Sequence, residues 1–531
     1  MGMDRRTVIA SGVAAAGLAA TAGGAQAASG PTANTRQGKV RGEAVVNGIK
    51  VFRGIPYGAP TGGANRFRAP QPPAAWSGVR DCLIYGDQSP QVAPPSVPLF
   101  TSWDRPVGES EDCLHLNVWT PATDGKKRPV MVWFHGGGFA QYNGSAPAYD
   151  GDRLCKRGDV VLVTVNHRLN IFGYLYLEEL GGAAWAGAAN AGQLDLVASL
   201  QWVRDNIASF GGDPGNVTIF GESGGGAKVC TLMAMPAAKG LFHKAIVESG
   251  PFVDGVSKQS ATETAKAVLA ALKLDPTQLD QLATLSTAQL LDAYKAVAPR
   301  ARSFAPVVDG NSLPRDPFDP DAPEISAAVP LLIGTNRDEM TLLAGSPATF
   351  GLDFNSLPVT LTPLLPHADV DQVIDDYRKI RPQATAPDVF FGITTQLFMT
   401  ANSVRIAERK AAQGSAPAYM YEVAWETPVM GGRFKSPHSV EIPFVFDTVA
   451  KSSSMVGDAK LAQPMAEQMC PAWIAFARTG NPQTKTLPPW PAYDARSRAT
   501  MVFNLKSEVV GDPGGDERAL LKDIPAIGMA R

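Results

Sequence analysis

The chain has 531 residues, with 48 lysines and arginines against 50 aspartates and glutamates, and a formal net charge of −2. This balance argues against a nucleic-acid-binding protein, because phosphate binding needs an excess or stripe of positive charge. With 45% hydrophobic residues the chain can bury a large core, which argues against intrinsic disorder. The length allows several domains, but large α/β enzymes reach it as one compact unit.

The first thirty residues differ in composition from the rest of the chain. Arg5 and Arg6 precede an Ala-, Val- and Leu-rich stretch over residues 8–22, and a small-x-small triplet ends at Ala27. This pattern predicts an export signal over residues 1–27, which cleavage removes. The paired arginines favour the twin-arginine route and a periplasmic or extracellular protein. Because the stretch is short and Gly-rich, we expect no stable membrane anchor.

Short apolar runs rich in β-branched residues recur between about residues 130 and 450, with helical periodicity between them. They predict strands at Val130–Phe134, Val160–Val165, Val217–Phe220, Ala245–Val247, Pro330–Ile333 and Tyr419–Val423, and helices at Leu196–Phe210 and Thr262–Leu272. Strands without polar alternation are typical of a mostly parallel sheet covered by helices on both faces. We therefore expect residues 28–531 to form a single doubly wound α/β domain, with the Pro-rich N-terminal hundred residues at the edge of the sheet.

A G-E-S-G-G sequence at residues 221–225 matches the G-x-S-x-G motif of serine hydrolases. The predicted strand Val217–Phe220 runs directly into it, and a helix-like run over Ala227–Met235 follows. Ser223 is therefore expected at a sharp strand-to-helix turn, where its hydroxyl projects above the edge of the sheet. The helix N-terminus would favour a developing oxyanion. We predict that Ser223 is a nucleophile.

A serine nucleophile needs a general base, and histidine is the usual base near neutral pH. In the chain order typical of this motif the base follows the nucleophile, which leaves His243, His367 and His438. His243 leads into a predicted strand soon after Ser223 and favours a structural role, and His367 could cap a helix. His438 stands in a loop after the strand Tyr419–Val423 and is the predicted base.

The carboxylate that orients this base is expected after a strand between the nucleophile and the base. Asp338 and Glu339 both follow the predicted strand at residues 330–333, and spacing alone does not choose between them. Asp309 is a third candidate, although its V-V-D-G context is typical of a turn.

A second glycine motif, H-G-G-G-F at residues 135–139, follows the predicted strand Val130–Phe134. Consecutive glycines let backbone amides approach an oxyanion without obstruction by Cβ atoms, as in the HGGG loops of esterases and lipases. His135 is expected to position this loop rather than to act as a second base. The two glycine motifs together predict an acyl-transfer enzyme.

The five cysteines are Cys82, Cys113, Cys155, Cys230 and Cys470. Because the number is odd, at least one stays unpaired within the chain. Cys82 and Cys113 flank a Pro-rich stretch and are the plausible pair, whereas the other three stand in apolar surroundings that favour burial. No Cys or His pair has metal-ligand spacing, so we expect neither a metal nor another cofactor.

Four further stretches complete a resemblance: F-R-G-I-P-Y at 52–57, S-E-D-C-L-H-L-N at 110–117, the run at 210–223 that ends in the G-E-S motif, and W-P-A-Y at 490–493. With these, the chain resembles the type-B carboxylesterases, which include para-nitrobenzyl esterases, mammalian carboxylesterases and cholinesterases. The resemblance covers nearly the whole mature chain. It implies an α/β-hydrolase fold and hydrolysis of carboxylic esters through an acyl-enzyme intermediate, without a cofactor.

The resemblance also implies site residues. The family's acid falls on Glu339, in G-T-N-R-D-E at 334–339, and its base on His438, shortly before E-I-P-F-V-F at 441–446. It places the catalytic triad on Ser223, His438 and Glu339.

The family's oxyanion donors fall on the amides of Gly137, Gly138 and Gly224. Gly224 stands where alanine is common, and we expect this difference to be harmless because only the amide acts. Cys82 and Cys113 match the family's first disulfide.

Trp103 stands ten residues before Cys113 and matches the tryptophan that binds quaternary ammonium in cholinesterases. Leu342 and Leu343, however, stand where cholinesterases carry aromatic side chains, so such a cage would be incomplete. Trp103 and Glu222 are kept as candidate substrate-binding residues.

The predicted function is hydrolysis of short-chain alkyl or aryl esters, with a small-molecule ester as the partner and no nucleic acid. The alternatives are a choline-ester-preferring esterase, an interfacial lipase, and a non-enzymatic adhesion protein of the same family. Adhesion proteins of this family have lost the nucleophile that Ser223 supplies here. Protein partners are not predictable from the sequence.

Overall fold

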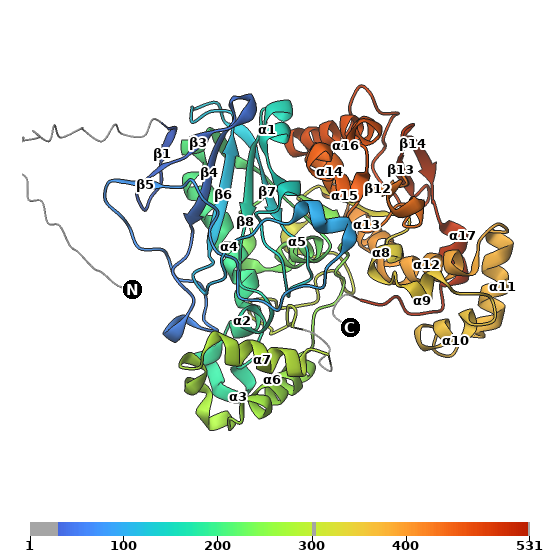
Figure 1. Cartoon of the computed structure of the whole chain (residues 1–531), viewed down its shortest axis with the longest axis horizontal. Helices are drawn as coiled ribbons and strands as arrows, with labels where there is room; N and C mark the ends of the chain where they lie inside the picture. The colour runs from blue at the N-terminus through green and yellow to red at the C-terminus, as the bar shows by residue number, and fades with distance from the viewer. Residues whose placement is uncertain (1–29, 300–303, 529–531) are drawn as a thin grey trace, which may run out of the picture.

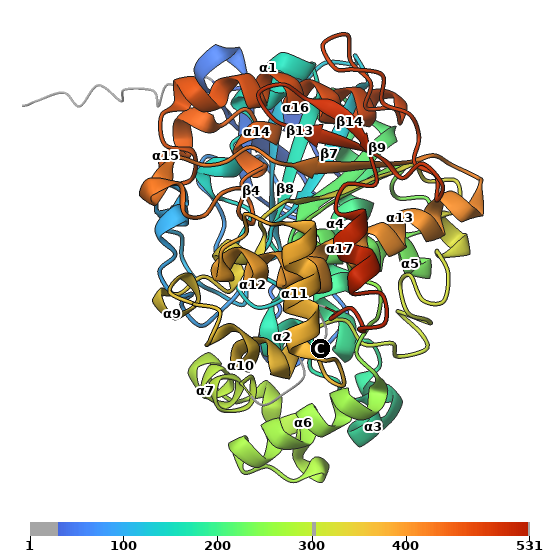
Figure 2. The same cartoon turned by 90° about the vertical axis from the view of Figure 1, so that its right-hand side faces the viewer.

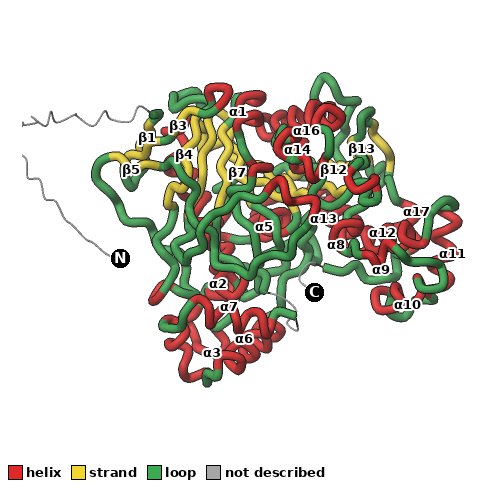
Figure 3. The backbone as a smooth tube through the Cα atoms, in the orientation of Figure 1, coloured by secondary structure: helices red, strands yellow, loops and turns green. Residues whose placement is uncertain are grey.

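The computed structural model describes residues 30–299 and 304–528, so the predicted export signal lies outside the described residues. A large sheet crosses the molecule (Figure 3). It has eleven strands in the order β14-β13-β12-β11-β10-β9-β7-β8-β6-β4-β3. Its strands are β3 (Glu43–Ala44), β4 (Lys50–Pro56), β6 (His115–Thr120), β7 (Arg128–Phe134), β8 (Val161–Val165), β9 (Gly212–Glu222), β10 (Lys244–Glu248), β11 (Leu331–Asn336), β12 (Ala418–Val423), β13 (Ala499–Phe503) and β14 (Glu508–Gly511). Each of the six predicted strands overlaps one of these strands.

The centre of the sheet is parallel and its edges are antiparallel. All neighbouring pairs from β8 to β13 are parallel, and β14, β6, β4 and β3 add antiparallel pairs at the two ends. A second, three-stranded sheet is formed by β1 (Thr32–Asn34), β2 (Lys39–Arg41) and β5 (Val79–Asp81). It lies beside the edge of the large sheet that contains β3 and β4 (Figure 1). The N-terminal residues therefore extend the edge of the fold, and the predicted α/β-hydrolase class is confirmed.

Helices cover both faces of the sheet because successive side chains of its strands point to opposite sides. Along β7, Val130 and Val132 belong to one buried apolar cluster, and Met131 and Trp133 to the other. The first cluster lies under α4 (Ala191–Asn206), α5 (Gly224–Ala234) and α13 (Ala401–Gln413), and the second under α1 (Asp152–Gly158), α14 (Ile442–Val445) and α16 (Ala459–Thr479). The predicted helix Thr262–Leu272 lies within α6 (Lys258–Leu272).

The remaining helices form lobes beyond the sheet (Figures 1 and 2). One lobe contains α6 with α2 (Asn170–Gly173), α3 (Glu178–Gly181) and α7 (Thr287–Val297). The other lobe contains α8 (Met340–Leu343), α9 (Pro347–Phe350), α10 (Leu357–Leu361), α11 (Val370–Ile380), α12 (Ala386–Thr395) and α17 (Gly515–Leu520). The short helix α15 (Ser453–Val456) packs beside the 3₁₀ turn Pro98–Trp103. Within the described ranges, none of the helices combines the length and apolarity needed to cross a membrane.

The strand order reverses at β7, which pairs with β8 on one side and β9 on the other. At this point Phe134, the last residue of β7, lies opposite Gly221 near the end of β9. Ligand sites of open α/β sheets lie at the carboxyl ends of strands where the order reverses. The sheet therefore brings the two glycine motifs together.

The structure does not contain the predicted disulfide, since Cys82 and Cys113 are both buried free thiols. The two thiols have different neighbours: Cys113 lies by Ser89 and Asp195, whereas Cys82 follows β5 beside Asp81. Burial raises the pKa of Cys82 to about 11, which favours the protonated thiol over the reactive thiolate.

Candidate active site

Ser223 is the single residue between the end of β9 and the start of α5. Its backbone has φ 57° and ψ −124°, a strained conformation for a residue with a side chain. The surrounding backbone enforces it, because a Cβ atom added at Gly221 or Gly225 would lie 2.6 or 2.0 Å from the carbonyl oxygen of Phe134. The predicted strand-to-helix turn is therefore present, with its serine held at the carboxyl edge of the sheet.

His438 and Glu339 form a buried pair in the structure. The Nδ1 atom of His438 lies 2.5 Å from Oε2 of Glu339, and neither side chain is more than 4% exposed. The other oxygen of Glu339 accepts a 2.7 Å hydrogen bond from the amide of Asn336, at the end of β11. Asp338 is turned toward another loop, where it accepts the amide of Ser436 at 3.2 Å. Of the two adjacent carboxylates, the fold brings Glu339 to the histidine.

The other candidates from the sequence lie elsewhere. His243 accepts the amide of Val217 at 3.1 Å, just before β10 begins. His367 is exposed to solvent, and Asp309 accepts the amide of Asn311 at 2.9 Å as a turn residue does. None of these three side chains lines the cavity that contains Ser223.

Glu222 faces the other ring nitrogen of His438. Its Oε1 atom lies 3.1 Å from Nε2 of His438 and accepts a 2.6 Å hydrogen bond from Ser439. No hydrogen bond joins Ser223 Oγ to His438 among the described residues. Burial by itself lowers the pKa of His438, but Glu222 and Glu339 outweigh it and raise the pKa to about 9. The imidazole thus lies between two carboxylates.

Two further buried glutamates, Glu441 and Glu248, lie near His438 and its two carboxylate neighbours. No sequence motif indicated a role for either of them. Glu441 accepts hydrogen bonds from Asn336 at 2.5 Å and Ser249 at 3.0 Å, and burial, together with Glu222 and Glu339, raises its pKa to about 8. Burial also raises the pKa of Glu248, which accepts the indole N–H of Trp473 at 2.7 Å. The carboxyl groups of Glu441 and Glu248 are therefore harder to ionise than that of an exposed glutamate.

The glycine loop after β7 approaches the turn at Ser223 very closely. Gly137 and Gly138 have φ of +82° and +61°, which favours glycine, and the carbonyl of Gly137 accepts the amide of Ala140 at 3.2 Å. A Cβ atom added at Gly224 would lie 2.0 Å from the carbonyl oxygen of Gly138. Glycine at position 224 therefore fits this loop, which leaves no space for the methyl group of an alanine.

These groups open into one cavity of about 610 Å³. Ser223 and His438 line it together with Trp103, Leu342 and Leu343. The ring of Trp103 stacks on Phe100 at 4.9 Å, and its indole N–H donates to Ser452 at 2.9 Å. The cavity therefore combines the side chains of Ser223 and His438 with a largely apolar wall.

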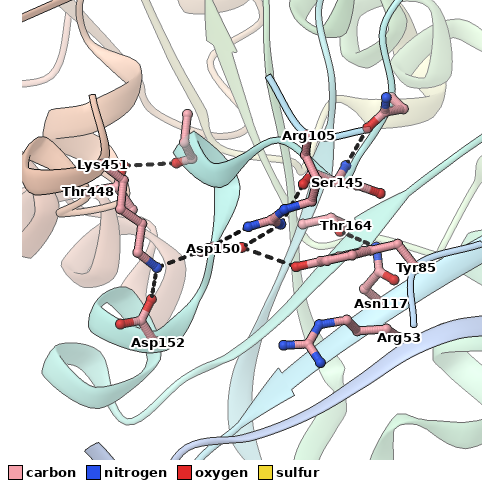
Figure 4. Close-up of polar contacts among 12 residues, drawn as sticks. Arg53, Tyr85, Arg105, Asn117, Ser145, Asp150, Asp152, Thr164, Thr448 and Lys451 are labelled. Atoms are coloured by element: carbon pink, nitrogen blue, oxygen red, sulfur yellow. Dashed lines mark hydrogen bonds and ion pairs between the residues drawn. The ribbon is translucent and has the colours of Figure 1, made fainter. Parts of the chain in front are cut away.

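An ion-pair network fixes the wall segment that carries Trp103 (Figure 4). Arg105 donates to both oxygens of Asp150, at 3.0 and 3.1 Å. Asp150 also accepts from Lys451 at 2.9 Å and from the hydroxyl of Tyr85 at 3.1 Å. Three segments distant in sequence thus meet at one carboxylate and hold the rim of the cavity.

One acidic cluster could hold a metal ion among the described residues. Carboxylate oxygens of Asp254, Asp316 and Asp319 lie within 4.8 Å of one another. Asp316 already accepts the amide of Gly255 at 2.8 Å, and Asp319 pairs with Arg409 at 2.8 Å. None of the three aspartates lines the cavity with Ser223, so the cluster has no part in its chemistry.

The comparison with known proteins agrees with this geometry. The sequence profile of the Carboxylesterase family matches residues 29–514. The chain belongs to the carboxylesterase family. It is 38% identical to para-nitrobenzyl esterase of Bacillus subtilis (strain 168), covering 92% of this chain and 97% of that protein. It is 33% identical to phenmedipham hydrolase of Pseudarthrobacter oxydans, covering 92% and 96%.

A solved structure shows the same likeness. The carboxylesterase EST55 of Geobacillus stearothermophilus superposes with a TM-score of 0.79 at 38% identity, covering 92% of this chain and 99% of that one. This carboxylesterase is therefore a carboxylic ester hydrolase with an α/β-hydrolase fold.

Proposed function

We propose that this carboxylesterase hydrolyses short-chain alkyl and aryl esters by acyl transfer to Ser223. The observation that carries the proposal is that Ser223, the His438–Glu339 pair and the glycine loop meet at one cavity. Ser223 Oγ attacks the ester carbonyl carbon while His438 accepts its proton, and Glu339 stabilises the imidazolium that forms. This step requires the imidazole ring of His438 to move so that Nε2 leaves Glu222 and accepts a hydrogen bond from Ser223, the next residue in the chain.

The amides of Gly137, Gly138 and Gly224 donate hydrogen bonds to the oxyanion of the tetrahedral intermediate. The C–O bond to the alcohol then breaks, the alcohol leaves with the proton from His438, and the acyl group stays on Ser223. Water, deprotonated by His438, attacks the acyl-enzyme in the same way and releases the acid. The cycle needs no cofactor.

The apolar wall supports short acyl chains and aromatic alcohols as substrates. Leu342, Leu343 and Trp103 line the cavity with apolar surface, which favours apolar acyl and aryl groups. Similarity to a relative named para-nitrobenzyl esterase supports esters of aromatic alcohols as substrates of this chain. Rates on para-nitrophenyl acetate, butyrate and palmitate test this proposal.

We expect acetate and butyrate to be hydrolysed much faster than palmitate. Activity that jumps when palmitate passes from monomer to emulsion would instead indicate an interfacial lipase. A preference for butyrylcholine over its uncharged carbon isostere would indicate a choline esterase with Trp103 as its cation site. Inertness toward every ester, without labelling by a fluorophosphonate, would indicate a non-enzymatic binding protein.

Substitution Glu222→Gln is expected to move the pH dependence of hydrolysis. His438 acts as a base only when neutral, and its pKa of about 9 means that kcat/KM rises up to that pH. Loss of the negative charge 3.1 Å from Nε2 lowers the pKa of His438, so the rising limb shifts to lower pH. Profiles of kcat/KM from about pH 6 to pH 10 measure the shift. A limb that stays in place would show that Glu222 does not govern the charge of His438.

We also propose that residues 1–27 direct export by the twin-arginine route. Replacing Arg5 and Arg6 together by lysine should retain the precursor inside the producing cell, while the unchanged signal yields mature protein outside the cytoplasm. Equal export of both forms would contradict this route. Titration of the exported, denatured protein then tests the cysteines: five reactive thiols match the structure, and three would show that Cys82 and Cys113 are linked after export.

A further inference from the structure

A lysine lies fully buried beside the active site, in an otherwise apolar stretch of helix α5. Lys228 has no exposed surface, and its ammonium donates a 2.8 Å hydrogen bond to the carbonyl oxygen of His135. It also lies 5.8 Å from the centre of the Phe139 ring. No carboxylate forms an ion pair with it within the described part of the chain. Because burial of an unpaired ammonium is costly, its presence needs an explanation.

Two buried histidines accompany this lysine. The rings of His135 and His167 lie 4.8 Å apart, and both side chains are 1% exposed. Burial and then the charge of Lys228 lower the pKa values of both histidines well below the usual value, which favours their neutral forms. Burial lowers the pKa of Lys228 itself to about 7, although Glu222 opposes the shift. Of these three groups, Lys228 therefore has the highest pKa.

Hydrogen bonds connect Lys228 to the oxyanion loop. Lys228 binds the carbonyl of His135, and Nδ1 of His135 lies 2.9 Å from the carbonyl of Gly136. That second carbonyl belongs to the same peptide group as the amide of Gly137. A donor that binds a carbonyl polarises its peptide group and strengthens the N–H on the other side. The two contacts therefore hold and polarise the backbone that leads to the first oxyanion donor.

We infer that Lys228 is a positioning residue of the oxyanion hole, an inference that rests on the proposed acyl transfer at Ser223. It holds the peptide group between His135 and Gly136, one residue before the amide of Gly137, and its ammonium is buried against this loop. A charge fixed in a buried, water-free place favours the transition state more than the ground state. Lys228 does not line the cavity that contains Ser223.

Lys410 provides a matched control. It is also fully buried, in α13, and its ammonium donates to the carbonyls of Ser326 at 3.1 Å and Ala327 at 2.6 Å. It does not line the cavity of Ser223. Lys228→Met and Lys410→Met therefore each remove a buried ammonium from backbone carbonyls, and only the first does so beside the oxyanion loop.

The test measures kcat and KM on para-nitrophenyl butyrate, the melting temperature, and inhibition by a trifluoromethyl ketone, whose adduct with serine carries an oxyanion. Lys228→Met is expected to lower kcat about ten- to a hundred-fold, to change KM less than about threefold, and to weaken the inhibitor in proportion to the loss of kcat. Lys410→Met should lower the melting temperature and leave kcat and inhibition as they are.

Lys228→Gln, which keeps a donor without the charge, replaces the methionine variant if that variant does not fold, and should show the same pattern with a smaller loss. The inference is overturned if the Lys228 variant keeps kcat, or if its inhibitor affinity does not change. Failure of the proposed function is distinguishable, because in that case the unsubstituted enzyme itself neither hydrolyses the ester nor reacts with a fluorophosphonate.

Discussion

Replacing Ser223 by alanine is expected to lower kcat/KM on para-nitrophenyl butyrate by at least about 10⁴-fold. The variant loses the atom that bonds to the acyl carbon, while the cavity and the glycine loop persist. What activity remains comes from binding and the oxyanion donors. Steady-state kinetics with a melting curve on the same sample measure the effect, and the melting temperature should stay close to that of the unsubstituted enzyme.

A second variant at the same position checks the geometry. Ser223 has φ 57°, where glycine is free of the strain that a side chain meets. Ser223→Gly should therefore be as inactive as Ser223→Ala but more stable than it by about 1 kcal/mol. Retention of activity within tenfold in either variant would show that another residue is the nucleophile.

Replacing Gly224 by alanine should lower kcat by about 10²–10³-fold, although alanine is a small change. The new methyl group would lie 2.0 Å from the carbonyl oxygen and 2.5 Å from the Cα atom of Gly138. The loop has to move, and the amide of Gly138 moves with it. Loss of one oxyanion donor costs about 2.7–4 kcal/mol of transition-state stabilisation, whereas binding of the ground-state ester depends little on it. The effect is therefore expected in kcat with KM nearly unchanged.

Gly125→Ala is the control for this substitution. Gly125 is exposed, and a Cβ atom added there meets nothing within 4 Å. It should leave kcat and stability unchanged. If Gly224→Ala also kept kcat within about threefold, the loop would adapt without cost and the close contact with Gly138 would not limit catalysis.

Local sequence patterns predicted the two strands and the two glycine motifs that position the site. The runs at β7 and β9 are apolar on both faces, which marks central strands before any partner is known. Each run ends in a glycine motif, and central parallel strands present their carboxyl ends at one edge. The turn at Ser223 and the loop at Gly137 followed from these features alone. The choice of Glu339 over Asp338 did not, because adjacent carboxylates look equivalent in a local pattern; the family resemblance indicated Glu339, and the structure brings it to His438.

The sequence did not predict side-chain contacts between residues that are far apart in the chain. Glu222 was singled out as a substrate-binding candidate, yet its carboxylate faces His438 and Ser439, more than two hundred positions away in the chain. Lys228 gave one signal, a charged residue in an apolar helix, but only the fold shows that its ammonium reaches His135. The cost of alanine at position 224 depends on a clearance from Gly138 that no pattern encodes.

The most direct test of the account is the site of covalent capture. The mature enzyme is treated with a fluorophosphonate, with and without prior incubation with the trifluoromethyl ketone, and the modified residue is located by peptide mass spectrometry. The account predicts one adduct per chain, on Ser223, formed in step with loss of esterase activity and blocked by the ketone. An adduct on another residue, or full loss of activity with Ser223 unmodified, would contradict it.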